Sequence, residues 1–95
     1  MAIGKESFRG KPFHLDALIP TETEIKSGKG ILHRVVINKA GTSVTIKLRD
    51  GPAGSLLAEV DGAALGSYIY DIGFNNGLAI EVDGTTAPDA TIVYT

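Results

Sequence analysis

The fold class is decided by residues 30–50, which read Gly-Ile-Leu-His-Arg-Val-Val-Ile-Asn-Lys-Ala-Gly-Thr-Ser-Val-Thr-Ile-Lys-Leu-Arg-Asp. This stretch holds two runs rich in β-branched residues, separated by a turn signal at residues 39–41. In the second run Val44, Ile46 and Leu48 alternate with polar residues, and a period of two places the apolar set on one face of a strand. The pattern predicts a half-buried antiparallel hairpin, and no helical period competes with it.

The rest of the chain repeats this pattern. Further strands are expected at residues 21–26, 56–60, 67–72, 77–82 and 90–94. Asp-Gly pairs at 50–51 and 61–62 predict turns, and the segment 83–89, which opens with a third Asp-Gly pair, predicts a loop. Turn signals at intervals of about 8–12 residues are typical of a sandwich or small barrel. We therefore expect an all-β protein whose residues 21–95 form one antiparallel β-sandwich.

The composition limits what the protein can be. A chain of 95 residues makes one domain, and small β domains often gain further burial by forming homo-oligomers. The chain has no cysteine, which removes disulfides, thiolate catalysis and cysteine-based zinc sites together. No apolar run is long enough for a signal peptide or a membrane span. We therefore expect that the protein has no membrane partner and is not exported by a standard signal.

Charge is divided unevenly along the chain. Residues 1–49 hold all nine Lys and Arg with four acids, a net +5, whereas residues 50–95 hold seven acids and no cation, a net −7. Either the two halves interleave as paired strands and their charges meet within one molecule, or opposite ends meet across a subunit interface. The basic residues are spread out and are not interleaved with aromatics, so no nucleic-acid partner is expected.

Residues 1–20 differ from the rest because two glycines and two prolines interrupt them. Their large apolar side chains are Phe8, Phe13, Leu15, Leu18 and Ile19. The segment is either the first strand of the sandwich or an extended N-terminal arm that docks these side chains on a neighbouring subunit. In both cases the five residues need a partner surface, and they are the candidate interaction residues.

No catalytic, cofactor or metal site is expected. A calcium loop needs several oxygens that converge on one point, and none of the Asp-Gly pairs has a further acid within the next few residues. His14 and His33 lack the additional ligands of a zinc site, and the serines lie in or beside turns without the context of a hydrolase nucleophile. The sequence therefore predicts a protein that is not an enzyme.

Aromatic residues near residue 70 leave one binding alternative open. On a strand Tyr68 and Tyr70 share a face, where with Phe74 they could stack a sugar. They could equally cover an open edge of the core with their hydroxyls in solvent, as Tyr94 could.

A resemblance adds to this residue-level interpretation. Residues 30–95 resemble small virion proteins of tailed bacteriophages, through a set of strand and turn segments. The segments are Gly-Ile-Leu-His at 30–33, Asn-Lys-Ala-Gly at 38–41, Leu-Arg-Asp-Gly at 48–51, Gly-Ser-Leu-Leu-Ala-Glu-Val at 54–60, Tyr-Asp-Ile-Gly-Phe-Asn-Asn-Gly-Leu at 70–78 and Ala-Thr-Ile-Val-Tyr-Thr at 90–95. They are mostly turn and core positions, so no functional residue is carried over.

The resemblance implies a jelly-roll-like sandwich and a non-enzymatic structural role in the virion, either as a capsid decoration (cement) protein at the capsid surface or as a head or tail accessory protein. The expected protein is a capsid decoration (cement) protein, a homotrimer that bridges subunits of the major capsid protein after synthesis in the host cytoplasm. The alternative is a carbohydrate- or receptor-binding module of a head fibre or tail, which relies on Tyr68, Tyr70 and Phe74.

Overall fold

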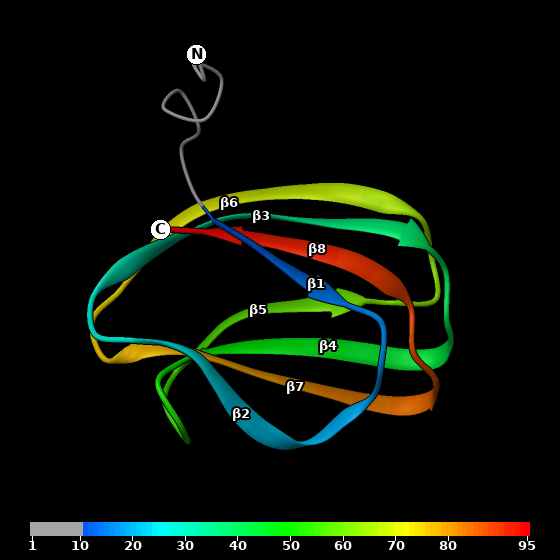
Figure 1. Cartoon of the computed structure of the whole chain (residues 1–95), viewed down its shortest axis with the longest axis horizontal. Coiled ribbons are helices and arrows are strands. Elements are labelled where there is room, and N and C mark those ends of the chain that lie inside the picture. Colours follow the sequence, from blue (N-terminus) through cyan, green and yellow to red (C-terminus); the bar gives the residue numbers. More distant parts are fainter. Residues whose placement is uncertain (1–10) are drawn as a thin grey trace.

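Eight β-strands make up the part of the chain that the structure, a computed structural model, describes, namely residues 11–95 (Figure 1). They are β1 (Lys11–Leu15), β2 (Ile19–Ser27), β3 (Gly30–Lys39), β4 (Thr42–Asp50), β5 (Leu56–Asp61), β6 (Gly66–Phe74), β7 (Gly77–Thr86) and β8 (Asp89–Tyr94). No helix occurs between residues 11 and 95. The all-β class expected from the sequence is confirmed.

The strands form two four-stranded sheets that pack against each other (Figure 1). Sheet A has the order β1-β8-β3-β6 and sheet B the order β2-β7-β4-β5. Every strand pairing is antiparallel. Along the chain most connections cross from one sheet to the other, and only β4 and β5 are both consecutive and paired. Eight antiparallel strands in this order form a jelly roll, so the predicted sandwich and its jelly-roll character are confirmed.

The predicted hairpin of residues 30–50 is wrong, although both of its strands exist. Strand β3 lies between β8 and β6 in sheet A, whereas β4 lies between β7 and β5 in sheet B. Each strand has one apolar face, and placing the two faces opposite each other across the core buries both of them. Gly41 lies in the connection that carries the chain from β3 to β4. The first carbon of a side chain there would lie 2.2 Å from the carbonyl oxygen of Thr86, so only glycine fits.

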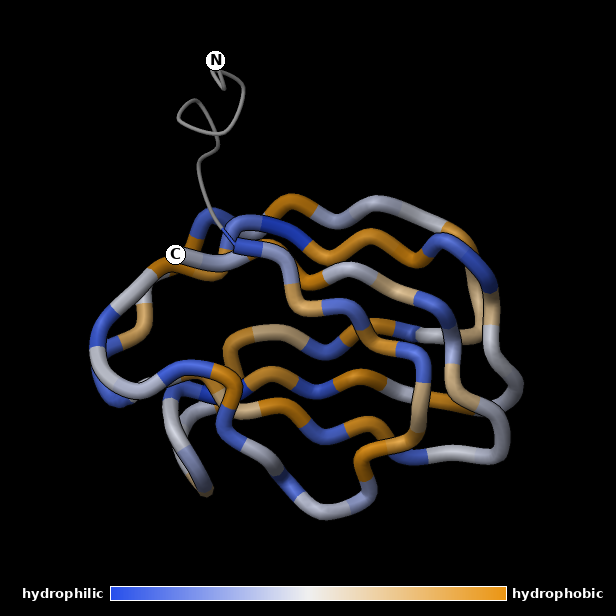
Figure 2. The backbone as a smooth tube through the Cα atoms, viewed as in Figure 1, coloured by the Kyte–Doolittle hydropathy of each residue, from blue (hydrophilic) through white to orange (hydrophobic). Residues whose placement is uncertain are grey.

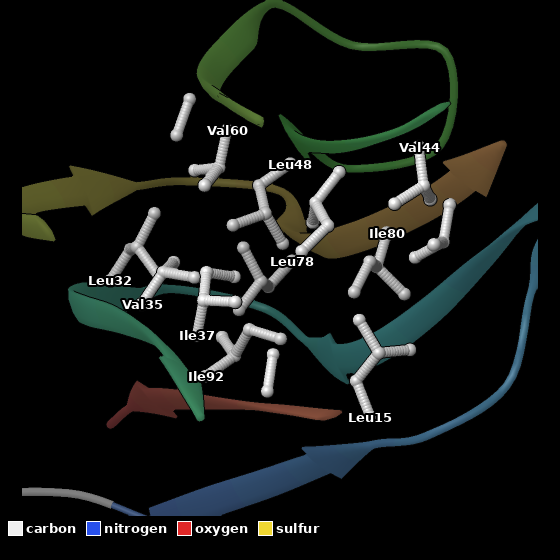
Figure 3. Packing of buried hydrophobic residues seen from close by; sticks show 14 of the residues in the cluster. Leu15, Leu32, Val35, Ile37, Val44, Leu48, Val60, Leu78, Ile80 and Ile92 are labelled. Atoms are coloured by element: carbon white, nitrogen blue, oxygen red, sulfur yellow. The ribbon is translucent and has the colours of Figure 1, made fainter. Parts of the chain in front are cut away.

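One continuous core fills the space between the sheets (Figure 3). Many of its members come from middle strands of the two sheets and are at most 3% exposed: Leu32, Val35 and Ile37 of β3, Val44, Ile46 and Leu48 of β4, and Leu78, Ile80 and Val82 of β7. Figure 2 shows hydrophobic and hydrophilic positions alternating along several strands. No polar or charged residue is buried within residues 11–95, so the core is held by apolar burial alone.

A β-bulge interrupts the regular pairing of β3. Leu32 pairs with Ile72 and Arg34 with Ile69, so two residues of β6 lie opposite His33 alone. One of these two residues is Asp71, whose φ of 47° lies in the left-handed region that a bulge residue adopts. The pairing of β3 with β8 is irregular at the same point, because Leu32 pairs with Tyr94 and Arg34 with Val93, which leaves His33 as the extra residue of β3. Both Leu32 and Val35 are therefore buried although they are three positions apart, and His33 lies beside Asp71.

The loop predicted to begin at Asp83-Gly84 begins later. Strand β7 continues to Thr86, with Asp83 paired to Thr45 and Gly84 paired to Val44. A side chain on Gly84 would lie 2.2 Å from the carbonyl oxygen of Ser43, so here glycine allows two backbones to approach closely within a sheet. The turns predicted at the other two Asp-Gly pairs are confirmed, because β4 and β5 end there.

Candidate interaction surfaces

Most of the candidate interaction residues find their partner surface within the sandwich itself. Leu15 lies on β1 opposite Ala90 and is 2% exposed (Figure 3), and Phe13 and Ile19 are half-buried against the same core. Leu18 stays 37% exposed in the connection between β1 and β2, and Phe8 lies outside the described residues. Because β1 pairs with β8 along its whole length, residues 11–15 are the first strand of the sandwich.

A different group of apolar side chains is exposed instead. Leu56 is 47% exposed, Leu65 67%, Ile69 72% and Ile72 37%. They lie on β5, on the connection between β5 and β6, and on β6, and we call them the apolar flank. These strands are the edges of sheets B and A on the side of the sandwich opposite β1 and β2. The exposure of Ile69 could have been predicted from the sequence. If Tyr68 and Tyr70 point inward on a strand, the residue between them points outward.

The four edge strands differ in how open they are to further pairing. Strand β1 has five residues and contains Pro12, and β2 contains Pro20 and two register irregularities. Strand β5 has six residues, including Glu59 and Asp61. Proline, irregular pairing, shortness and charge are the features that protect natural sheet edges. Strand β6 has nine residues and no proline, and residues 66–69 pair without interruption with residues 34–37 of β3.

The outer face of sheet B is anionic. Lys47 of β4 lies between Glu59 of β5 and Glu81 of β7 in the strand register. Asp61 and Asp83 flank the outward position two residues earlier on β4. Lysine from the first half of the chain therefore meets acids of the second half within one molecule, in agreement with the first of the two charge alternatives. These four carboxylates outnumber Lys47 and Arg49, the two cations of β4 on this face, so the face carries a net negative charge.

Glu22 braces the end of sheet B near the turn after β4. Its carboxylate lies 3.4 Å from Nε of Arg49 and accepts a hydrogen bond of 2.7 Å from the backbone N–H of Ala53. Both charged side chains are largely buried, at 29% and 22% exposure, so they are shielded from solvent more than a surface pair is. The contacts hold β2, β4 and the residue 51–55 turn together.

Two histidine–aspartate pairs lie on sheet A. Nε2 of His14 on β1 is 2.9 Å from Oδ1 of Asp89 on β8, and Nδ1 of His33 on β3 is 3.3 Å from Oδ1 of Asp71 on β6. The hydrogen bond to Asp89, together with the charge of that carboxylate, raises the pKa of His14 above its ordinary 6.5. The same hydrogen bond lowers the pKa of Asp89 below 3.8. Each pair links neighbouring strands.

His33 also contacts the hydroxyl of Thr95 through Nε2. A hydroxyl, an imidazole and a carboxylate in this order are the components of a nucleophilic triad. Asp71 is 68% exposed, however, and such chemistry depends on a site that excludes water around preorganised donors. Backbone hydrogen bonds between Thr95 and Ile31 continue the sheet at this point, and His33 fastens the same end. These contacts tie the start of β3 to β6 and to Thr95.

The aromatic residues lie against the core. Tyr68, Tyr70 and Tyr94 are half-buried and pack on the core cluster, and Phe74 is 2% exposed. Burial raises the pKa of Tyr70 above its ordinary 10.0. These positions fit the second of the two alternatives, in which tyrosines cover an open edge of the core, and they leave the carbohydrate alternative without an exposed aromatic pair.

Within residues 11–95 no three His, Asp or Glu side chains are placed to share a metal ion. The same residues include no helix that is long and apolar enough to span a membrane.

Comparison with known proteins identifies the fold class and nothing narrower. No protein-family model and no curated protein sequence matches the chain. A structure described as the Drosophila NLP-core, whose title concerns pentamer formation and histone binding, is similar with a TM-score of 0.56 and 7% identity over 90% of this chain and 98% of that one. A structure from work on Bacillus endospore appendages, described as disulfide-linked pili, is similar with a TM-score of 0.52 and 14% identity over 88% of this chain and 80% of that one. At such identities the likeness concerns the fold alone.

Proposed function

We propose that this protein is a non-enzymatic structural protein of a tailed-bacteriophage virion, a capsid decoration protein that binds the major capsid protein as a homo-oligomer. The apolar flank is the observation that carries the proposal. Burial of exposed apolar surface is favourable, so the flank residues, which are 37–72% exposed, are candidates for burial against other proteins. A small sandwich with a pure apolar core and an exposed apolar flank works through the surface that it buries against other proteins.

The virion assignment draws on the sequence resemblance, and the jelly-roll order agrees with it because viral capsid domains use that architecture. A decoration protein stabilises a capsid by bridging neighbouring subunits, since separating them then also breaks the contacts of the bridge. Even modest interfaces become large when they are repeated over a symmetric lattice. A trimer suits the three-fold positions of such a lattice.

The structural neighbours support self-association. One is described as forming a pentamer and the other as forming pili, so two sandwiches of this fold are parts of assemblies. This chain has no cysteine, so its own assembly cannot use the disulfide links named for the pili. The anionic outer face of sheet B is a second surface, and a basic partner surface on the capsid would be attracted to it at low salt.

The test is to locate the protein in tailed-phage particles produced by cells that carry its gene. Mass spectrometry of purified particles, after separation of heads from tails, should find the protein in heads in proportion to the major capsid protein. Purified protein added to heads stripped of it should rebind and raise the temperature at which they release DNA. A protein that is absent from heads, or present only in the tail fraction, would refute the decoration role.

The expected trimer is tested separately by light scattering on the purified protein. The measured mass should be three times the chain mass of 9.9 kDa. A different multiple would correct the trimer and keep the self-association, whereas a monomer at high micromolar concentration would contradict both.

A further inference from the structure

We infer that the outer face of sheet A, formed by the side chains that point away from the core, is the surface through which copies of this chain pair. The two copies are related by a two-fold axis that runs across the strands. The inference rests on the self-association proposed above and names the surface that performs it. Because a two-fold axis relates copies in pairs, the oligomer contains an even number of chains, whether single chains or trimers pair.

The outer face of sheet A carries little charge. Residues directly opposite each other in the register of a sheet lie on the same face, so the pairings show which side chains are neighbours. Two adjacent rows cross all four strands, namely Pro12, Val93, Arg34 and Ile69, and His14, Thr91, Val36 and Ser67. Arg34 is the only Lys, Arg, Asp or Glu among them. The centres of protein interfaces have this composition, since they are poor in Lys, Glu and Asp and enriched in Arg.

The outer face of sheet B shows that the fold does not require such a composition. Two adjacent rows across β7, β4 and β5 present Glu81, Lys47 and Glu59, and Asp83, Thr45 and Asp61, of which all but the threonine are charged. On sheet A, by contrast, Val36 and Val93 are half-buried and Ile69 is 72% exposed. Covering the outer face of sheet A therefore buries apolar surface at little electrostatic cost.

The placement of charge selects a second copy as the occupant. Arg34 has no ion pair and no side-chain hydrogen bond within residues 11–95. It lies opposite Val93 of β8, and Asp89, four residues before Val93 on the same strand, points to the same outer face. Thr91 lies midway between them, opposite Val36. A two-fold axis across the strands at Thr91 therefore exchanges the level of Arg34 with the level of Asp89.

This exchange brings the cation of each copy to the carboxylate of the other. Arg34 and Asp89 are on neighbouring strands, so the sideways step between them is about 4.8 Å, within the reach of a long arginine side chain. The carboxylate is 41% exposed although His14 and Asn38 contact it, so it can accept a further donor. A face with one cation and one carboxylate on opposite sides of an uncharged pair of residues is complementary to itself.

The same axis brings exposed apolar side chains together. Ser67 lies opposite Val36, on the level of the axis. Ile69 is two residues after Ser67 and Leu65 is two residues before it, so the axis exchanges their levels as well. Ile69 and Leu65 are 72% and 67% exposed, the largest fractions among the large apolar residues of 11–95. Two sheets that pack face to face interdigitate their side chains about 10 Å apart, so Ile69 of each copy is covered near Leu65 of the other.

The experiment reverses the two charges singly and together. Arg34→Asp places a carboxylate opposite Asp89, and Asp89→Arg places a cation opposite Arg34. Each single variant should halve the mass of the wild-type oligomer in light scattering at high micromolar concentration. The double variant has opposite charges in every pair again, so it should regain the wild-type mass. Lys29→Asp, the same change of charge at an exposed residue between β2 and β3, should keep that mass, and circular dichroism should show the same β-sandwich in all variants.

The apolar contact is tested without any change at Asp89. Ile69→Lys places a charge against Leu65 of the other copy, so it should also halve the mass. The matched control is Leu56→Lys, at an exposed apolar residue that lies opposite Arg49 on the outer face of sheet B. This variant should keep the wild-type mass.

A cysteine probe locates the axis. The chain has no cysteine, so Ser67→Cys on β6 and Ser27→Cys at the end of β2 each introduce a single thiol at an exposed position. Because Ser67 lies on the level of the axis, a short bismaleimide should join two Ser67→Cys chains covalently. It should not join two Ser27→Cys chains, and adding Arg34→Asp to Ser67→Cys should abolish the product.

The mass of the wild-type protein separates the possible outcomes. An even multiple of 9.9 kDa that the face variants halve supports the pairing. A trimer would confirm the three-fold arrangement and overturn the pairing, and a monomer would overturn the self-association as well. An oligomer whose mass the face variants leave unchanged, equal disruption by Lys29→Asp or Leu56→Lys, or equal crosslinking of the two cysteine variants would overturn this contact alone. None of these results depends on where the protein lies in a virion.

Discussion

Truncation of Leu15 to alanine tests whether β1 belongs to the sandwich. Leu15 is 2% exposed and lies in the core cluster (Figure 3). The change removes three carbon atoms that are each worth about 0.8 kcal/mol of burial, or about 2.4 kcal/mol in total. Incomplete collapse of the cavity adds to this, and buried Leu→Ala changes cost about 2–5 kcal/mol. We expect a loss of about 3 kcal/mol in the free energy of unfolding, which is a large part of the roughly 5–14 kcal/mol of a domain this size.

The matched control is Leu18→Ala, the same change three residues later at a position that is 37% exposed. It leaves no closed cavity, so we expect a loss of about 1 kcal/mol or less. Urea denaturation followed by circular dichroism, with both variants at one protein concentration, measures the difference. The midpoint for Leu15→Ala should fall with an unchanged slope, and its melting temperature should drop by about 12–24 °C. If Leu15→Ala costs no more than Leu18→Ala, then Leu15 does not pack in the core and the reasoning fails.

Two further predictions concern an ion pair and a backbone contact. Because the pKa of His14 is raised, its contribution to stability is complete below pH 6.5 and is lost as the pH rises through the raised pKa. Because the pKa of Asp89 is lowered, its contribution is present above pH 3.8 and is lost as the pH falls through the lowered pKa. NMR titration should show the His14 pKa above 6.5 and its return toward that value in Asp89→Asn, and an unchanged His14 pKa would refute the pairing. Gly41→Ala should destabilise the fold by about 1–3 kcal/mol, because its new carbon would lie 2.2 Å from a backbone oxygen of Thr86, while Gly73→Ala, whose nearest neighbour would be 3.8 Å away, should cost under about 1 kcal/mol. Equal melting temperatures for these two glycine variants would contradict the close approach at Gly41.

The alternation of side chains along the chain was sufficient to predict the fold class. Val44, Ile46 and Leu48 face the core as the period of two required, and so do Leu78, Ile80 and Val82 on β7, although Ala79 between them is buried as well. The reason is local, since successive side chains on a strand point to opposite faces whatever the strand pairs with. The eight observed strands include all those expected from residue 21 onward, with ends that differ by a few residues.

Pairing and accessibility were decided only by the tertiary structure. A strand's pattern shows that one face must be buried and does not say which strand lies beside it, so β3 and β4 were expected to pair and instead face each other across the core. Asp83-Gly84 has the composition of a turn, yet Gly84 serves a close approach to Ser43 that arises only when β7 meets β4.

The candidate interaction residues also separate what the sequence determines from what the tertiary structure decides. The sequence by itself determined that Phe13, Leu15 and Ile19 need an apolar partner surface, because burial of such side chains is favourable wherever it occurs. Only the assembled sheets decided that this surface is the chain's own core and that Leu65 and Ile69 are left exposed at the opposite flank. The physical reason is that hydrophobicity is a property of each residue, whereas exposure is what remains after all the strands have competed for one limited core.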